Sequence, residues 1–516
     1  MANAEVTTSS EKNKRVILNV IMNLSYQAVI LVFGFLIPRL YLVKFGSDVN
    51  GLDNTIKNIF AYLALLEAGV GLSAQHALYS PIATGDTDKI NGILSASRKF
   101  YLKSGVAYTL ITIVFAVVYP LLVRTTLDYF TIFFVIILYG LPGIIAFLLR
   151  GKYNALLEVD GKKYIMTMLA TISLALSNIL RLVFLVMSDN LIVIQATYCV
   201  PSIIQILFIM IYVRKKYKWV NWKATPDFQS LSQKKSVLIH QISACIFSNT
   251  DTIVISVICG MNYASVYAVF SLFFANLQKL VTAFTDSVTF KFGQMFFVDR
   301  DRFYKLFDRY ESVYYMLLFA CYTIVTAYLM PIIKLYTSGI ADASIYYSKI
   351  LLFLFATLTV LTGTEVPMQQ MLNIAGKYDD TKHQAILEMT INIAVSISAV
   401  FKIGIAGCLV GTIVALIYRN SALVLFVTKN VMNKKPIDNY KRIAVNMAAS
   451  LAVIFFLGTD SCAPSGYMYV IGKAALNSIC IVAWFVAVNF VFDRGNYISM
   501  LSEIKMLIKK RGAIEN

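Results

Sequence analysis

The sequence predicts an all-α polytopic membrane protein with about fourteen transmembrane helices. Apolar residues make up 58% of its 516 residues and charged residues only 14%, whereas a soluble domain has about 25% charged residues. The mean hydropathy is +0.69. Apolar stretches of about eighteen residues or more recur along the chain, and basic residues collect in alternate loops between them. These observations together argue against a soluble globular protein.

The apolar stretches can be assigned to membrane spans one by one. A helix needs about twenty residues to cross the hydrocarbon of a bilayer, and several stretches are longer than that. Polar residues within a stretch such as 52–80 indicate a surface that faces protein rather than lipid. The predicted spans are 16–38, 52–80, 104–123, 129–149, 164–187, 191–213, 236–259, 264–292, 311–333, 345–373, 384–401, 404–428, 443–458 and 469–492.

Positive charge predicts the orientation of these spans. The linker 214–235 carries seven Lys and Arg residues, and the other loops on the same side are also basic. The opposite loops, such as 188–190 and 260–262, are short and nearly uncharged. Because cytoplasmic loops carry the excess of Lys and Arg, both termini are expected in the cytoplasm. The net charge of +18 is then explained by topology and by anionic lipid headgroups, and we expect no nucleic-acid partner.

The two halves of the chain resemble each other at an offset of about 211–215 residues. At this offset Asn50 falls on Asn262, and Pro120 falls on Pro331. Such matches favour two six-helix lobes related by a pseudo-two-fold axis along the membrane normal. The predicted parts are an N-terminal lobe 1–213, a cytoplasmic basic linker 214–235, a C-terminal lobe 236–428, and 429–516, which holds two further spans and a basic tail.

Four stretches carry a family resemblance. They read NGLDNTIKNIFAYLALLEAGVGL from Asn50, DTDKINGILSASRKFY from Asp86, DTIVIS from Asp251 with YASVYAVF from Tyr263, and AGKYDD from Ala375. Together they resemble the MOP superfamily, and within it the Wzx-type polysaccharide flippases. The resemblance implies two lobes around a central cavity that works by alternating access. It also implies a substrate, an undecaprenyl-diphosphate-linked oligosaccharide repeat unit, and as partners a polysaccharide polymerase and other assembly proteins.

Cations inside the predicted spans are the candidate substrate-binding residues. A charge in the hydrocarbon is costly unless it meets water, a partner or a ligand. A lipid diphosphate is an anion, which Arg can bind through a bidentate fork. We expect Lys279, Arg39, Lys57 and Arg181 to line a cationic cavity. For Lys57 the alternative is snorkelling to the nearby interface. Arg419, near the inner end of its span, is interpreted as a topology signal.

Two acidic residues are candidates for gating. At an offset of 212 residues, Arg39 falls on Asp251 and Glu67 falls on Lys279. The repeat would therefore place opposite charges at similar depths in the two lobes. We hypothesise that both pairs form gate contacts when one side of the cavity closes. The alternative is that each ion pairs within its own lobe and holds helices together.

A third acidic residue, Glu365, is a candidate for coupling. It lies two residues before Pro367 in the span 345–373. Proline inside a helix frees a carbonyl and kinks the helix, which often accompanies a binding site. Glu365 is therefore expected either to take up a proton or Na⁺, or to pair with Arg181.

The preferred interpretation is a monomeric exporter in the cell membrane that flips lipid-linked oligosaccharides and is not an enzyme. No cofactor is expected, and the three His residues have no clustered partners for a metal. One alternative is a MATE-like cation-coupled drug or metabolite antiporter. Such relatives usually have an acidic residue in the first span, and 16–38 has none. The other alternative is a membrane-embedded polysaccharide polymerase, for which the expected large external loops are missing from the sequence.

Overall fold

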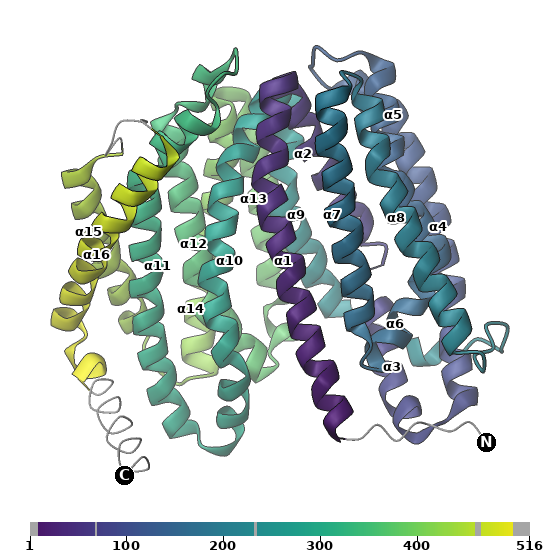
Figure 1. The fold of residues 1–516 in the computed structure, drawn as a ribbon. Coiled ribbons are helices and arrows are strands. Elements are labelled where there is room, and N and C mark those ends of the chain that lie inside the picture. The colour runs from purple at the N-terminus through teal and green to yellow at the C-terminus, as the bar shows by residue number, and fades with distance from the viewer. Residues whose placement is uncertain (1–8, 68–69, 232–234, 460–465, 499–516) are drawn as a thin grey trace, which may run out of the picture. The chain divides into compact units, whose positions relative to one another are not determined.

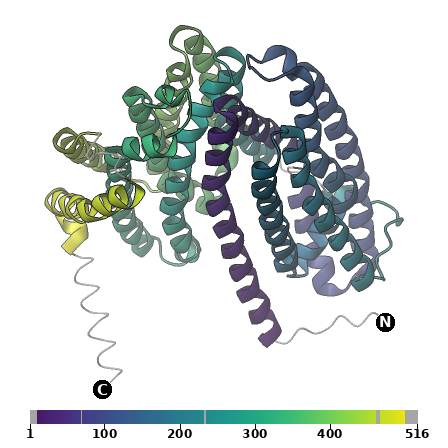
Figure 2. The ribbon, with the colours of Figure 1, turned by 45° about the horizontal axis from the view of Figure 1, so that its top comes forward.

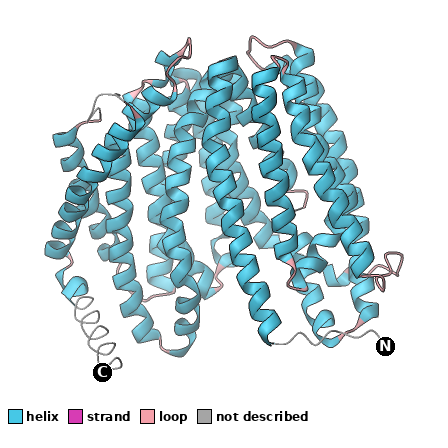
Figure 3. Ribbon diagram, viewed as in Figure 1, coloured by secondary structure: helices cyan, strands magenta, loops and turns pink. Residues whose placement is uncertain are grey.

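The computed structural model describes residues 9–67, 70–231, 235–459 and 466–498. Within these residues the regular structure is helical and contains no strand (Figure 3). Thirteen of the described helices are long and apolar enough to cross a membrane. The protein is therefore a multi-pass all-α membrane protein, as its composition predicts. The chain divides into two compact units, Met1–Ser265 and Val266–Asn516, and each is described by itself.

The first unit is a bundle of long helices (Figure 1). Its elements are α1 (Ser9–Phe45), α2 (Ser47–Ala64), α3 (Val70–Thr84), α4 (Thr87–Leu122), α5 (Tyr129–Ile145), the π-helical turn η1 (Ala146–Arg150), α6 (Gly151–Val159), α7 (Lys163–Met187), α8 (Leu191–Lys216), the 3₁₀ turn η2 (Gln229–Leu231) and α9 (Lys235–Ile258). Aspartate caps fix the starts of two helices, because Asp86 accepts the N–H of Lys89 and Asp128 accepts that of Thr131. Helix α7 packs on α1 and α8, and α5 packs on α4 and α8.

The predicted span 52–80 is not one continuous helix in the structure. Helix α2 ends at Ala64, and α3 begins only at Val70. The chain leaves α2 through a tight turn in which the N–H of Glu67 donates to the carbonyl of Ala64 at 3.0 Å. Gly69 follows Glu67 two residues later in the sequence, and glycine costs about 1 kcal/mol in a helix interior. The break places Glu67 in the turn after α2, where its carbonyl accepts the N–H of Gly71 at 3.4 Å.

The basic linker is docked against the start of α4. This part of α4 is amphipathic, and its apolar face is buried against α3, α6 and the linker. The N–H of Asp227 donates to the carbonyl of Gly92 at 3.0 Å. The hydroxyl of Ser95 donates to the carbonyl of Ala224 at 2.6 Å. The apolar face of this helix thus packs on protein rather than on a membrane surface.

The second unit contains the remaining long helices. Its elements are α10 (Met261–Val298), whose first turn belongs to the first unit, α11 (Arg300–Tyr336), the 3₁₀ turn η3 (Ala343–Tyr346), α12 (Lys349–Ala375), α13 (Tyr378–Ile403), α14 (Ile405–Asn430), α15 (Ile437–Leu457) and α16 (Tyr467–Phe492). Helix α14 packs on both α12 and α13. The last two helices, α15 and α16, both pack on α11 and are drawn in yellow-green and yellow in Figures 1 and 2.

Small residues let α13 and α14 approach closely. A Cβ atom at Gly407 would lie 2.4 Å from the carbonyl carbon of Ala399. A Cβ atom at Gly411 would lie 2.4 Å from the backbone nitrogen of Ser396. Backbones that touch through small residues are a common way to pack helices in a membrane, where lipid tails provide no hydrophobic drive for association. The two helices therefore form a tight hairpin.

Arg442 fastens the last two helices to α11. Its guanidinium group, on α15, lies 2.6 Å from Glu311 and 3.1 Å from Asp308, both on α11. It also lies 2.9 Å from Asp493, directly after α16. The buried guanidinium of Arg442 thus joins three helices through three carboxylates. Such a cluster stabilises the fold only while every charge in it keeps a partner.

Candidate functional site

Lys57 is held by its own helix. Its ammonium nitrogen lies 2.5 Å from a carboxylate oxygen of Asp53, one turn earlier on α2. The Lys57 side chain is 42% exposed, whereas that of Asp53 is 8% exposed. Lys57 therefore neutralises the buried carboxylate of Asp53, and part of its own side chain stays exposed. This is more than the snorkelling that the sequence left open.

Arg181 is enclosed within the first unit. It is 4% exposed on α7, and its Nη2 donates to Oε1 of Gln195 on α8 at 3.2 Å. The guanidinium carbon lies 5.2 Å from the ring centroid of Tyr198 and 5.8 Å from that of Tyr41, within the range of cation–π attraction. In this conformation the guanidinium joins α1, α7 and α8, so direct contact with a ligand would require a rearrangement.

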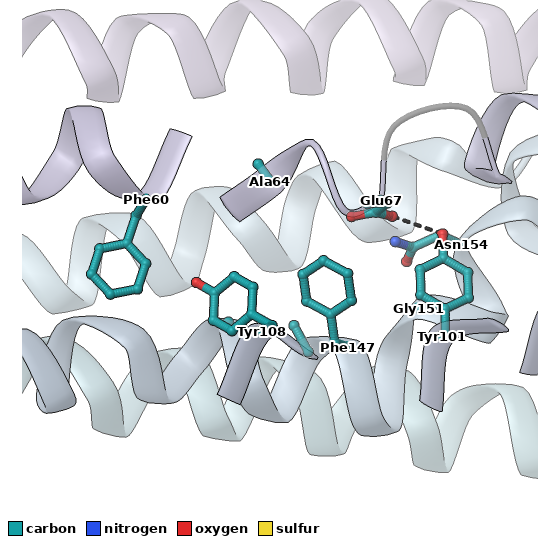
Figure 4. Close-up of a pocket in the computed structure, with 10 residues that line it drawn as sticks. Phe60, Ala64, Glu67, Tyr101, Tyr108, Phe147, Gly151 and Asn154 are labelled. Atoms are coloured by element: carbon teal, nitrogen blue, oxygen red, sulfur yellow. Dashed lines mark hydrogen bonds between the residues drawn. The ribbon is translucent and has the colours of Figure 1, made fainter. Parts of the chain in front are cut away.

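Glu67 lines a cavity of about 170 Å³ in the first unit (Figure 4). The hydroxyl of Tyr101 donates to its Oε1 at 2.8 Å. Asn154 also lines the cavity, and its buried Oδ1 has no hydrogen-bond partner in the part of the chain that the structure describes. Phe60 lies at the apolar end of the same cavity (Figure 4). The space can hold a few water molecules, but it is far too small for an oligosaccharide.

Helix α2 meets α9 and the start of α10 along a polar seam, here called the α2–α9 seam. The hydroxyls of Tyr62 on α2 and Thr250 on α9 lie 2.5 Å apart. Nearer the start of α2, Nδ2 of Asn50 donates to the hydroxyl of Ser265 at 2.6 Å. The seam thus contains neutral hydrogen bonds between short polar groups, which can be exchanged for bonds to water at a small net cost.

The same seam contains a very close backbone contact. A Cβ atom at Gly51 would lie only 2.0 Å from the carbonyl oxygen of Met261. Only glycine at position 51 allows this approach. On α4, the hydroxyl of Tyr119 donates to that of Ser256 on α9 at 3.0 Å, and Ser256 is fully buried. This end of the first unit is therefore closely packed.

The other predicted site residues are Asp251, Arg39 and Lys279. Asp251 follows Thr250 on α9 and is 2% exposed, and Arg39 is half-buried on α1. Lys279 is exposed on α10 and belongs to the second unit, whereas Glu67 belongs to the first. The gate pairs suggested by the repeat, Arg39 with Asp251 and Glu67 with Lys279, stay predictions.

Glu365 has a different partner from the one suggested by the sequence. It pairs with Arg419 on α14, with 3.3 Å between Oε1 and the guanidinium Nε. The same Nε lies 3.5 Å from Oε2 of Glu388 on α13. Arg419 also donates from Nη2 to Oε1 of Gln369 at 3.2 Å. Its side chain is only 3% exposed, so the interpretation of Arg419 as a topology signal is wrong.

Comparisons with known proteins identify the fold. No family model and no curated protein matches the chain. Among solved structures, it is similar to the lipid II flippase MurJ in an inward closed conformation, with a TM-score of 0.67 and 14% identity over 91% of this chain and 99% of that one. It is also similar to an inward-facing multidrug resistance MATE family transporter of the MOP superfamily, with a TM-score of 0.59 and 14% identity over 81% of this chain and 96% of that one. A Vibrio cholerae MATE transporter variant gives a TM-score of 0.53 at 15% identity, over 83% of this chain and 99% of that one.

The chain has the fold of MOP superfamily transporters. The superfamily resemblance read from the sequence is thus confirmed at the level of the fold. The MOP fold brings together Glu365, Glu388 and Arg419 from three helices, and it leaves Lys57 exposed beside its partner. Among the described residues, no group of three or more His, Cys, Asp or Glu side chains could hold a metal ion.

Among the charged residues of these clusters, Asp53 was missed in the sequence, Arg419 was misread, and Glu388 was noted inside a span but given no role. Asp53 stands four residues before Lys57, and this spacing alone predicts an ion pair on one helix face. Glu388 and Arg419 come from different helices, so no local spacing connects them. The signal available for both was their position inside an apolar span, where an unpaired charge is costly.

Proposed function

We propose that this protein is a flippase that moves oligosaccharide repeat units linked to undecaprenyl diphosphate across the cytoplasmic membrane. One observation carries the proposal. The lipid II flippase MurJ matches 91% of the chain, with a TM-score of 0.67, whereas the two MATE transporters match 81% and 83% with lower scores. A lipid-linked, anionic substrate also suits a transporter whose intramembrane charges include exposed cations.

In this proposal, Lys57 and Lys279 are the first residues to meet the diphosphate. Both side chains are exposed, and a lysine ammonium is a compact point charge that suits a diphosphate. Lys57 would exchange its contact with Asp53 for one with the substrate. Arg39 is a further candidate on α1. Arg181 is enclosed by Tyr41 and Tyr198, so it would contribute positive potential rather than a direct contact.

The α2–α9 seam is proposed to close the external side of the transport path. The charge pattern of the loops predicts that the start of α2 and the end of α9 lie on the external side of the membrane. The seam is made of short neutral hydrogen bonds, which can open and close at low cost. Substrate would enter from the cytoplasm while the seam is closed, and opening of the seam would release it outside. The pairs Arg39–Asp251 and Glu67–Lys279 are proposed to assist this gating.

The test is translocation in liposomes that carry a fluorescent undecaprenyl-diphosphate oligosaccharide. Accessibility of the sugar on each leaflet is followed for wild type, for Lys279→Ala, and for Lys402→Ala as a matched control, since Lys402 is an exposed lysine at the end of α13. We expect protein-dependent translocation that falls at least tenfold in Lys279→Ala and is retained in Lys402→Ala. Equal rates in the two variants would remove Lys279 from the site, and no translocation with several glycans would contradict the flippase.

A MATE-like antiporter is the second candidate, because two MATE transporters share the fold. Cation-driven efflux of a small organic cation from the same liposomes, without any movement of the lipid-linked sugar, would favour it.

A further inference from the structure

Two carboxylates in the second unit share a single guanidinium group. Oε1 of Glu365 and Oε2 of Glu388 lie 3.3 Å and 3.5 Å from the same nitrogen, Nε of Arg419. The three residues come from the middle of α12, α13 and α14. Their side chains are 19%, 13% and 3% exposed, respectively. All three helices are long and apolar enough to cross a membrane, so the cluster lies well inside its helices.

The charges in this cluster do not balance. Two ionised carboxylates and one guanidinium carry a net charge of −1. Arg419 is the only described side chain that forms an ion pair with either carboxylate. The neutral groups around it supply no positive charge: Gln369 accepts from Arg419, and the Tyr314 and Tyr315 hydroxyls of α11 donate to carbonyls of α12. An uncompensated charge among apolar helices is costly, and like charges in one site are unfavourable.

A metal ion is a poor way to restore the balance. A cation would have to bind beside a guanidinium group that is already in contact with both carboxylates, and the two positive charges would repel each other. A proton restores neutrality without needing space or further ligands. It converts one carboxylate into a carboxylic acid, which can donate a hydrogen bond to the other carboxylate or to an amide oxygen.

We propose that Glu365 and Glu388 are a proton-binding site and share one exchangeable proton next to Arg419. The proton comes from bulk water, forms an O–H bond on one of the two carboxylates and leaves by the same route. Arg419 keeps the other carboxylate ionised, so the site takes one proton and not two. If transport is coupled to this proton, that coupling rests on the proposed function, but the site itself does not.

Infrared difference spectroscopy of the purified full-length protein tests the site without any substrate. A protonated carboxylic acid has its own C=O stretching band, distinct from that of a carboxylate. We expect a band in wild type near neutral pH that disappears at alkaline pH. We expect the band to be lost in Glu365→Gln and equally in Glu388→Gln, because the remaining carboxylate then has the guanidinium to itself.

If both variants lose the band, the proton is shared by the two carboxylates. If the proton belonged to one buried acid, only the substitution of that acid would remove the band. Glu158→Gln makes the same chemical change on the short helix α6, where Glu158 pairs with Lys163, and should keep the band. Persistence of the band in either cluster variant, or its absence from wild type at every pH, would overturn the proposal. If Arg419→Gln folds, its band should be about twice as strong, because both acids would then be protonated. Failure of lipid-linked sugar translocation, with the band behaving as expected, would contradict the proposed function and leave the proton site intact.

Discussion

At the scale of single residues, the pairing of charges decides which side chains remain available. Lys57 and Asp53 neutralise each other on one helix, but 42% of the lysine side chain stays exposed. Arg419 and Arg442 are each surrounded by more than one carboxylate. The exposed lysines are therefore suited to bind a ligand, and the buried arginines are suited to hold helices together and to keep neighbouring carboxylates ionised.

Substituting Lys57 should lower stability, because the Asp53 carboxylate is then buried without a positively charged partner. We expect Lys57→Met to lower the free energy of unfolding by about 1–3 kcal/mol, between the values for exposed and buried ion pairs, because Asp53 is left buried without its ammonium partner. The double variant Asp53→Asn with Lys57→Met should recover part of that loss. Denaturation in detergent measures both, and a double variant that is less stable than the sum of the two single changes would contradict this account.

Arg442 should be far more important for stability than its neighbour Lys434. We expect Arg442→Met to cost about 3–5 kcal/mol, since it leaves buried carboxylates on α11 unpaired. Lys434 also pairs with Asp308, at 3.6 Å, but it is 36% exposed, and such pairs contribute about 0–1 kcal/mol. Lys434→Met is therefore the matched control. Thermal unfolding with similar losses in the two variants would show that Arg442 does not anchor α15 and α16.

At the scale of elements, the basic linker contains a turn in which Asp227 caps Ser230. The stability of this turn should depend on pH. The hydroxyl of Ser230 donates to Asp227 at 2.5 Å and its N–H donates at 3.1 Å, and these bonds hold the pKa of Asp227 below its ordinary value. A lowered pKa stabilises the docked linker above the ordinary value for aspartate, and the contribution is lost as the pH falls through the lowered value.

We expect hydrogen exchange at the Ser230 amide to show constant protection above about pH 5, once corrected for the intrinsic exchange rate, and a progressive loss below about pH 4. Asp227→Asn should show weaker protection that does not change over this range. Protection in wild type that is also independent of pH would mean that the carboxylate does not hold the turn.

Helix boundaries show how far sequence reasoning extends. Long apolar runs predict α7 and α8 closely, because each is bounded by polar or glycine-containing loops. The predicted span 129–149 ends four residues after α5, because the helix continues through η1 into α6. The break between α2 and α3 was missed because hydropathy stays high across it, and only Gly69 and Gly71 indicate it in the sequence. Partners such as Glu388 and Arg419 lie on different helices, and no spacing within one helix reveals which faces meet. The superfamily resemblance could be predicted, but the contacts of the candidate site could not.

At the scale of the whole molecule, the proposed flippase mechanism requires the α2–α9 seam to open during each transport cycle. We expect a disulfide between Asn50→Cys and Ser265→Cys, in a background without native cysteines, to reduce translocation at least tenfold and to be reversed by a reductant. These side chains are 2.6 Å apart in the seam. The assay is the same liposome translocation of lipid-linked sugar.

A matched pair in the second unit provides the control. Asn392 on α13 donates to Thr412 on α14 at 2.9 Å, within a hairpin that we expect to move as one body. A disulfide between Asn392→Cys and Thr412→Cys should leave translocation nearly unchanged. Equal inhibition by both disulfides would mean that the oxidation itself, rather than closure of the seam, stops transport.

The π-helical turn η1 has a consequence for how this protein can change over evolution. A π-helical turn contains one residue more than an α-helical turn, so η1 is equivalent to a single-residue insertion in the helix. Deleting one residue from Ala146–Arg150 would therefore restore a regular α-helix and leave the residues before and after it on their present faces. Asn154 would then still face the cavity that it now shares with Glu67. This short segment could thus lose one residue without displacing the lining of the cavity, whereas a deletion in a regular α-helix turns all later residues of that helix by about 100°.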